Sequence, residues 1–115
     1  MSIDDPVLWT WEADALVLEG ALDTPAARTV LPEVQAAWSD RGVRRTLDLT
    51  DLDLEDGVAN ALLVDLVRSL RDAAGGLRLE GAPQMLAHVL YKVGDLEDLR
   101  LELVHPRVEE GGPVD

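Results

Sequence analysis

Residues 47–81 read LDLTDLDLEDGVANALLVDLVRSLRDAAGGLRLEG, and the order of patterns in this stretch decides the fold. Gly57–Ala74 has the period of an amphipathic helix, and the two glycines after it supply a stop. The apolar segments on either side, Thr46–Leu49 and Leu77–Glu80, are predicted strands. A strand, a helix and a second strand in this order predict two parallel strands joined by a crossover.

The predicted helix has one apolar stripe along its length. The stripe consists of Ala59, Leu62, Leu63, Leu66, Val67, Leu70 and Ala73. We expect the other side of the helix to lie away from the core, and that side carries Asn60, Val64, Asp65, Arg68, Arg71 and Asp72.

Two strands and a helix are predicted before this stretch. Val7–Trp11 and Ala15–Glu19 are short apolar segments, and the break between them predicts a hairpin. Gly20 is expected to end the second strand.

The helix that follows is predicted over Pro25–Ser39. Thr24 is expected to be its N-cap, and Pro25 suits the first helical position because no N–H is needed there. Pro32 is expected to kink or restart this helix.

The C-terminal third adds a helix over Pro83–Val93 and a strand over Leu99–Leu103, whose apolar and charged residues alternate. Residues 106–115 are rich in Glu, Gly and Pro and are expected to form an acidic, disordered tail. The sequence therefore predicts a single α/β domain over residues 1–105, with a mixed, mostly parallel sheet of about five strands and three main helices.

Composition excludes several classes of function. The chain has 115 residues, with 10 Lys and Arg against 23 Asp and Glu, which gives a net charge of −13. Nucleic acids and anionic membranes require clustered cations, so neither is an expected partner. There is no Cys and no apolar run of membrane-spanning length, and Met1–Pro6 lacks the basic start of a signal peptide. We therefore expect a cytoplasmic protein without direct membrane insertion.

The acidic residues before the central helix do not fit a calcium loop. In a frame that starts at Asp51, Asp56 stands where glycine is required and Leu62 stands where a bidentate Glu is required. Asp48 ends a strand as a phospho-acceptor would, but no acidic pair follows the first strand to hold Mg²⁺. The sequence therefore predicts no metal site.

The remaining candidates for catalysis are the two histidines. Neither His88 nor His105 has a serine or carboxylate placed to form a triad. Glycine-rich phosphate-binding motifs are absent from the sequence. We predict no catalytic residues and no cofactor, and a non-enzymatic protein; an enzyme or metal-binding domain of unfamiliar chemistry is the alternative from a different class.

The strand and loop Leu47–Gly57, the helix after it and the segment Gly75–Gly81 resemble the STAS domain family. That family has a "hydrophobic-D-L-S" strand, a loop ending in Asp-Ser/Thr-Ser/Gly-Gly-Leu, a helix and a "G-G-x-L-x-L-x-G" strand. Leu18–Asp23 resembles its "hydrophobic-x-G-x-L-D" signature, and Lys92–Leu96 resembles the turn after its third helix. The resemblance covers about Leu8–Leu103.

The chain departs from the family at the position that is phosphorylated. The family's Asp falls on Asp56, and its phosphorylated Ser or Thr falls on Gly57, which has no hydroxyl. The next three positions, Ser/Gly, Gly and Leu in the family, are Val58, Ala59 and Asn60 here. The usual phosphorylation cannot take place at Gly57.

The resemblance implies a regulatory module that binds a protein through the loop at Asp56 and the exposed face of the next helix. On this sequence the implied partner-binding residues are Asp56, Gly57, Asn60, Ala61, Val64, Asp65 and Arg68. Val64, an apolar residue among polar ones, is the contact that we would test. The charge of −13 favours a partner with a basic patch.

Two classes of partner stay open at this point. The first is an anti-sigma kinase-like regulator, with the chain as an anti-sigma-factor antagonist. The second is the ATPase of a lipid-transport ABC complex, with the chain as its accessory STAS subunit; the brief lead-in before the Ala15–Glu19 strand resembles that branch.

Overall fold

The sheet begins with the predicted antiparallel hairpin. In the computed structural model, which describes residues 7–41, 46–94 and 101–105, β1 (Leu8–Glu12) pairs with β2 (Ala15–Leu22). Ala13 takes a left-handed φ of 56° in the tight turn between them. The hairpin is followed by parallel strands only.

The second strand is longer than the sequence predicts. β2 runs through Gly20 to Leu22, because β4 (Leu52–Leu54) pairs in parallel with its last three residues. The N–H of Gly20 also donates to the carbonyl of Asp51, at 3.1 Å. The expectation that Gly20 ends the strand is therefore wrong, and β4 is a strand that the sequence analysis missed.

The rest of the sheet has the predicted parallel character. β3 (Thr46–Asp48) pairs with the first half of β2, β5 (Leu77–Glu80) pairs with β3, and β6 (Leu101–Val104) pairs with β5. The order is β1-β2-β3-β5-β6, with β4 beside β2. A mixed, mostly parallel sheet is confirmed. Leu99 and Arg100 of the predicted last strand lie outside the described residues, as does the expected tail over 106–115.

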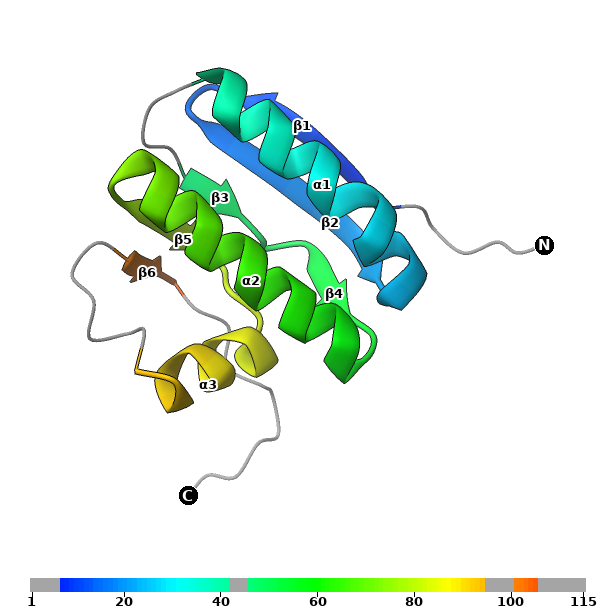
Figure 1. Ribbon diagram of the computed structural model, residues 1–115. Helices are drawn as coiled ribbons and strands as arrows, with labels where there is room; N and C mark the ends of the chain where they lie inside the picture. Colours follow the sequence, from blue (N-terminus) through cyan, green and yellow to red (C-terminus); the bar gives the residue numbers. More distant parts are fainter. Residues whose placement is uncertain (1–6, 42–45, 95–100, 106–115) are drawn as a thin grey trace.

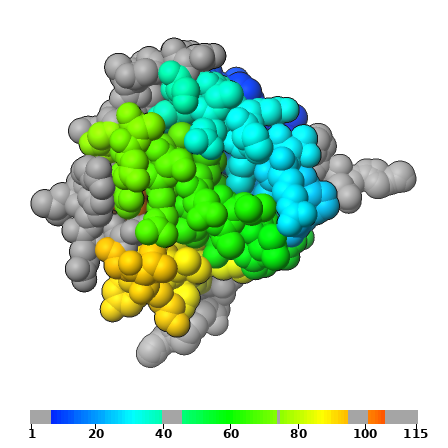
Figure 2. All heavy atoms as spheres, viewed as in Figure 1, coloured from blue at the N-terminus to red at the C-terminus, as the bar shows by residue number. Residues whose placement is uncertain are grey.

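The part of the chain that the structure describes has three helices over the sheet, as predicted. They are α1 (Thr24–Arg41), α2 (Gly57–Ala74) and α3 (Gln84–Lys92). α1 and α2 lie side by side on one face of the sheet, and α3 packs against α2 (Figure 1). In Figure 2 the three helices form one continuous surface.

The start of α1 differs from the prediction. Oδ1 of Asp23 accepts a hydrogen bond from the N–H of Ala26 at 2.9 Å, so Asp23 caps this helix and Thr24 does not. The helix also continues through Pro32 as one element and does not restart there. Thr24 has another role, in contact with α2, which is described below.

The core lies between the helices and one face of the sheet, and it is built largely from leucine. Its fully buried leucines include Leu16, Leu18, Leu47 and Leu79 on the strands. The alternate strand residues face the other way. On that face Glu12, Glu19, Arg78 and Glu102 are exposed, and Asp48 and Glu80 are half-buried.

Part of the expected polar side of α2 is buried. Asn60, Val64 and Arg71 are 4%, 5% and 7% exposed. α3 packs against α2 and contacts this flank at Asn60, whose Nδ2 donates to the carbonyl of Met85 at 3.3 Å. The prediction that these three residues lie away from the core is wrong, whereas Asp65, Arg68 and Asp72 are exposed as expected.

The sharp turn after β5 yields the first prediction. Gly81 has a φ of +66°, and a Cβ there would meet Oγ1 of Thr50 and lie 2.7 Å from its Cα. Gly75 has a similar φ of +73° but nothing within 4 Å of an added Cβ. We expect Gly75→Ala to cost about 1–2 kcal/mol of unfolding free energy from backbone strain. Gly81→Ala should lower the unfolding free energy by about 1–3 kcal/mol more than Gly75→Ala does, because the clash with Thr50 adds to the backbone strain.

Urea denaturation of the two variants measures both losses. Because the φ angles are alike, Gly75→Ala is a matched control for the clash alone. Equal losses in the two variants would contradict the close approach of Gly81 to Thr50.

Candidate functional site

The start of α2 lies where β2 and β4 end. Strand β4 leads into the helix through Glu55 and Asp56, and the N–H of Glu55 donates to the carbonyl of Leu22 at 2.9 Å. This bond holds the loop against the end of β2. The loop that the family resemblance singled out is therefore fixed by backbone contacts.

Asp56 joins the starts of the two long helices. It is the N-cap of α2, and its Oδ1 accepts from the N–H of Ala59 at 2.7 Å. The same oxygen accepts from the hydroxyl of Thr24 at 2.9 Å, and Oδ2 accepts from the N–H of Thr24 at 3.1 Å. One carboxylate thus satisfies donors from both α1 and α2.

These hydrogen bonds favour the charged form of the carboxylate. The N–H of Ala59 first, and then the hydroxyl of Thr24, hold the pKa of Asp56 below its usual value. The negative charge also lies at the positive end of the α2 dipole. Asp56 therefore carries a persistent negative charge at this end of the molecule.

Gly57 follows Asp56 as the first residue of α2 and is exposed. A Cβ built at this position has no neighbouring atom within 4 Å, so the space does not require glycine. The residue has no hydroxyl to accept a phosphoryl group.

The structure brings most of the implied partner-binding residues together. Gly57, Ala61, Asp65 and Arg68 are exposed along one face of α2, and Asp56 is half-buried at its start. Asn60 and Val64 are not part of this face, because α3 covers them. The prediction that Val64 is an exposed contact is wrong.

Two exposed apolar residues near this face were missed. Val58, the second residue of α2, is 49% exposed, and Met85, near the start of α3, is 44% exposed. Asn60 links the two helices here through its bond to the carbonyl of Met85. Val58 falls outside the apolar stripe of the helix, and that position was the available signal. Met85 could not be placed without knowing how α3 packs.

Two further features concern metal binding and membrane insertion. Among residues 7–41, 46–94 and 101–105 there is no group of three or more His, Asp or Glu side chains that could hold a metal ion. None of the helices in these ranges is long and apolar enough to cross a membrane.

Comparison with known proteins gives matches in structure alone. No family model matches the chain, and no curated protein matches it. A protein of Thermotoga maritima described as an anti-sigma factor antagonist has a similar structure, with a TM-score of 0.57 and 17% identity; the match covers 85% of each chain. The Bacillus cell fate determinant SpoIIAA, in its phosphorylated form, matches with a TM-score of 0.61 and 16% identity over 85% of this chain and 90% of its own. Both are STAS domains, and the chain has the STAS fold.

The charge of Asp56 yields the second prediction. Because its pKa is lowered in the folded state, ionisation of this group stabilises the protein above the ordinary carboxyl pKa of about 3.9. That contribution is lost as the pH falls through the lower pKa of the folded protein. We expect Asp56→Asn, which keeps a capping side chain, to melt at a lower temperature than wild type at about pH 7. The difference should shrink towards about pH 3.

Thermal unfolding at several pH values checks this expectation. Asp51→Asn removes an exposed carboxylate from the turn before β4 and is the matched control. A gap between wild type and Asp56→Asn that stays constant with pH would show that the charge has no part in stability.

Gly57 yields the third prediction. Because nothing lies within 4 Å of its added Cβ, Gly57→Ala should raise the unfolding free energy by about 0.4–1 kcal/mol, through lower entropy of the unfolded chain. Chemical denaturation measures the change. A loss of stability would mean that the start of α2 requires glycine.

Proposed function

We propose that this protein is a non-enzymatic regulatory protein of the anti-sigma-factor antagonist type, which binds a protein partner through the start of α2. The observation that carries the proposal is the likeness in fold to two structures of STAS regulators over 85% of the chain. A fold hosts more than one function, so the proposal also needs a surface suited to binding.

The exposed residues around the start of α2 offer such a surface. Val58 and Met85 expose apolar side chains, and Asp65 and Arg68 provide opposite charges further along the helix. An apolar centre with a charged rim is the usual composition of a protein interface. Ala61 is small and exposed between them, so a partner can approach the helix closely.

Binding at this surface is not switched by phosphate at residue 57. In the family resemblance, Gly57 stands at the phospho-acceptor position, and it carries no hydroxyl. A phosphate there would add about 1.5–2 negative charges beside Asp56 and so change the charge that a partner meets at this surface. Without it, occupancy depends on the concentrations of the two proteins or on another signal.

The overall charge supports a partner with a basic surface. The net charge of −13 speeds encounter with such a partner and disfavours acidic competitors. An anti-sigma kinase-like regulator is the partner that we propose, and the ATPase of a lipid-transport ABC complex is the alternative.

The fourth prediction tests the surface by capture from host cells. The wild-type chain is compared with an Ala61→Lys, Arg68→Glu double variant, which places two altered exposed side chains on α2. The matched control is Ala36→Lys, Arg28→Glu, which makes the same chemical changes at exposed positions of α1. Circular dichroism first establishes that all three proteins are folded.

We expect wild type and the α1 variant to capture the same protein, and the α2 variant to capture at least about tenfold less, as for loss of interface contacts. Capture of a kinase-like regulator supports the antagonist function, and capture of an ABC ATPase supports the alternative. Equal capture by the two variants would show that the partner does not bind at this face of α2. Capture of neither a kinase-like regulator nor an ABC ATPase would overturn the proposal.

A further inference from the structure

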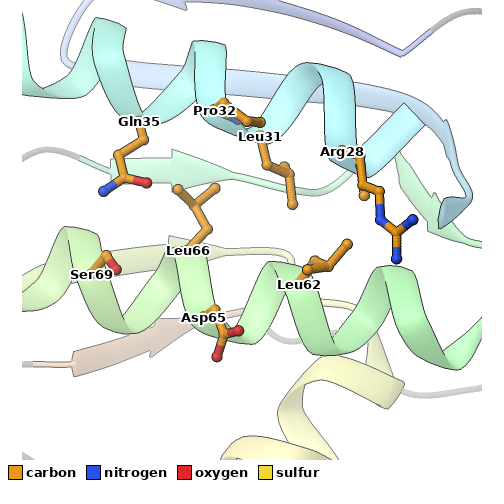
Figure 3. A pocket seen from close by; sticks show the side chains of 9 residues that line it. Arg28, Leu31, Pro32, Gln35, Leu62, Asp65, Leu66 and Ser69 are labelled. Atoms are coloured by element: carbon orange, nitrogen blue, oxygen red, sulfur yellow. The ribbon is translucent and has the colours of Figure 1, made fainter. Parts of the chain in front are cut away.

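A groove runs between α1 and α2 on the outer surface of the molecule. Its volume is about 300 Å³, and Figure 3 shows its lining side chains on the two helices. Leu31, Leu62 and Leu66 form an apolar floor, with Leu31 and Leu66 buried and Leu62 half-buried. The groove extends from Arg28 to Gln35 along α1, about 10 Å at the rise of an α-helix.

Arg28 stands at one end of this groove. In Figure 3 its side chain extends from α1 towards α2, beside Leu62. It has no hydrogen bond or ion pair with any residue that the structure describes. The guanidinium is therefore available to a ligand.

Glu33 on α1 and Asp65 in the groove lining form no ion pair with Arg28 and have other surroundings. Glu33, the next acidic residue along α1, accepts a hydrogen bond from Nε1 of Trp9 at 3.2 Å and so faces β1. Asp65 is the one acidic residue among the described residues that line the groove. Figure 3 shows its carboxylate on the side of α2 that points away from α1.

We propose that this groove binds a small amphipathic carboxylate, with an unbranched apolar tail on the leucine floor and the carboxylate at Arg28. A volume of about 300 Å³ is at the lower end for small-molecule sites and holds about ten water-sized groups. Guanidinium and carboxylate form charge-assisted hydrogen bonds in a matched geometry. The inference goes beyond the protein-binding function and does not depend on it.

The net charge of −13 opposes the binding of an anionic ligand, but only the part of that charge close to the groove acts on the ligand strongly. At physiological ionic strength, exposed charges more than about 8 Å away are largely screened. The local charge balance at the groove then depends on Arg28 and Asp65, and the tail adds the transfer of apolar surface out of water.

The fifth prediction uses octanoate, which has about ten non-hydrogen atoms and fits the volume. We expect octanoate to bind with a dissociation constant of about 1 mM, given the usual affinity per atom of ligands of this kind. In a nitrogen-15 NMR titration, the shifted amides should cluster at residues 28–35 and 62–69. 1-Octanol, with the same tail and no charge, should bind about fivefold more weakly.

Arg28→Gln should weaken the binding of octanoate about fivefold and leave the binding of octanol unchanged, because the substitution removes the positive charge and keeps the leucine floor of the groove. Lys92→Gln, the control, removes an exposed cation of α3 that does not line the groove and should leave the binding of both ligands unchanged. The proposal would be overturned if the wild-type protein bound octanol and octanoate equally well, or if the two variants had equal effects. Tighter binding of octylammonium than of octanoate would also overturn it, and so would amide shifts at other residues or no amide shifts at all.

Discussion

The carboxylate of Asp56 sets the position of both long helices. It caps α2 through Ala59 and accepts two hydrogen bonds from Thr24, the first residue of α1. The strands that precede these helices end at the same level, because Leu22 of β2 is paired with Leu54 of β4. The two helices therefore start together and run parallel across the sheet. Their shared start brings Arg28 beside Leu62, so the outer groove also depends on this one contact.

Elements with strong local patterns could be predicted from the sequence. The helix Gly57–Ala74 has a complete apolar stripe, an aspartate cap before it and a glycine in the left-handed conformation after it, so local signals fix both ends. β4 was missed because three residues are too few to show a period, and pairing with β2 is what makes them a strand. Thr24 and Asp23 are both good capping residues, and only the position of Asp56 assigns Thr24 to a contact between helices.

The candidate site was predictable in its loop and in part of its helix face. Motif spacing placed Asp56 and Gly57 at the start of α2, where the structure has them. The burial of Asn60 and Val64 was not predictable, since their polar neighbours gave no sign of a second helix covering that flank. Where a helix contacts two partners, the apolar stripe identifies the larger contact and leaves the smaller one hidden. In this protein the smaller contact is the one between α2 and α3, and it includes the hydrogen bond from the buried Asn60 to the backbone of Met85.

The face of the sheet opposite α1 and α2 affects how copies of this protein meet. Among the described residues it carries the carboxylates of Glu12, Glu19, Asp48, Glu80 and Glu102, against the guanidinium of Arg78, which pairs with Glu102. Two molecules that stacked these flat surfaces would bring like charges together without water to screen them. Mutual repulsion therefore discourages stacking of the sheets, and it does so at no cost to the leucine core on the other side. Of the two faces of the sheet, the one covered by α1 and α2 is therefore better suited to contacts with other molecules.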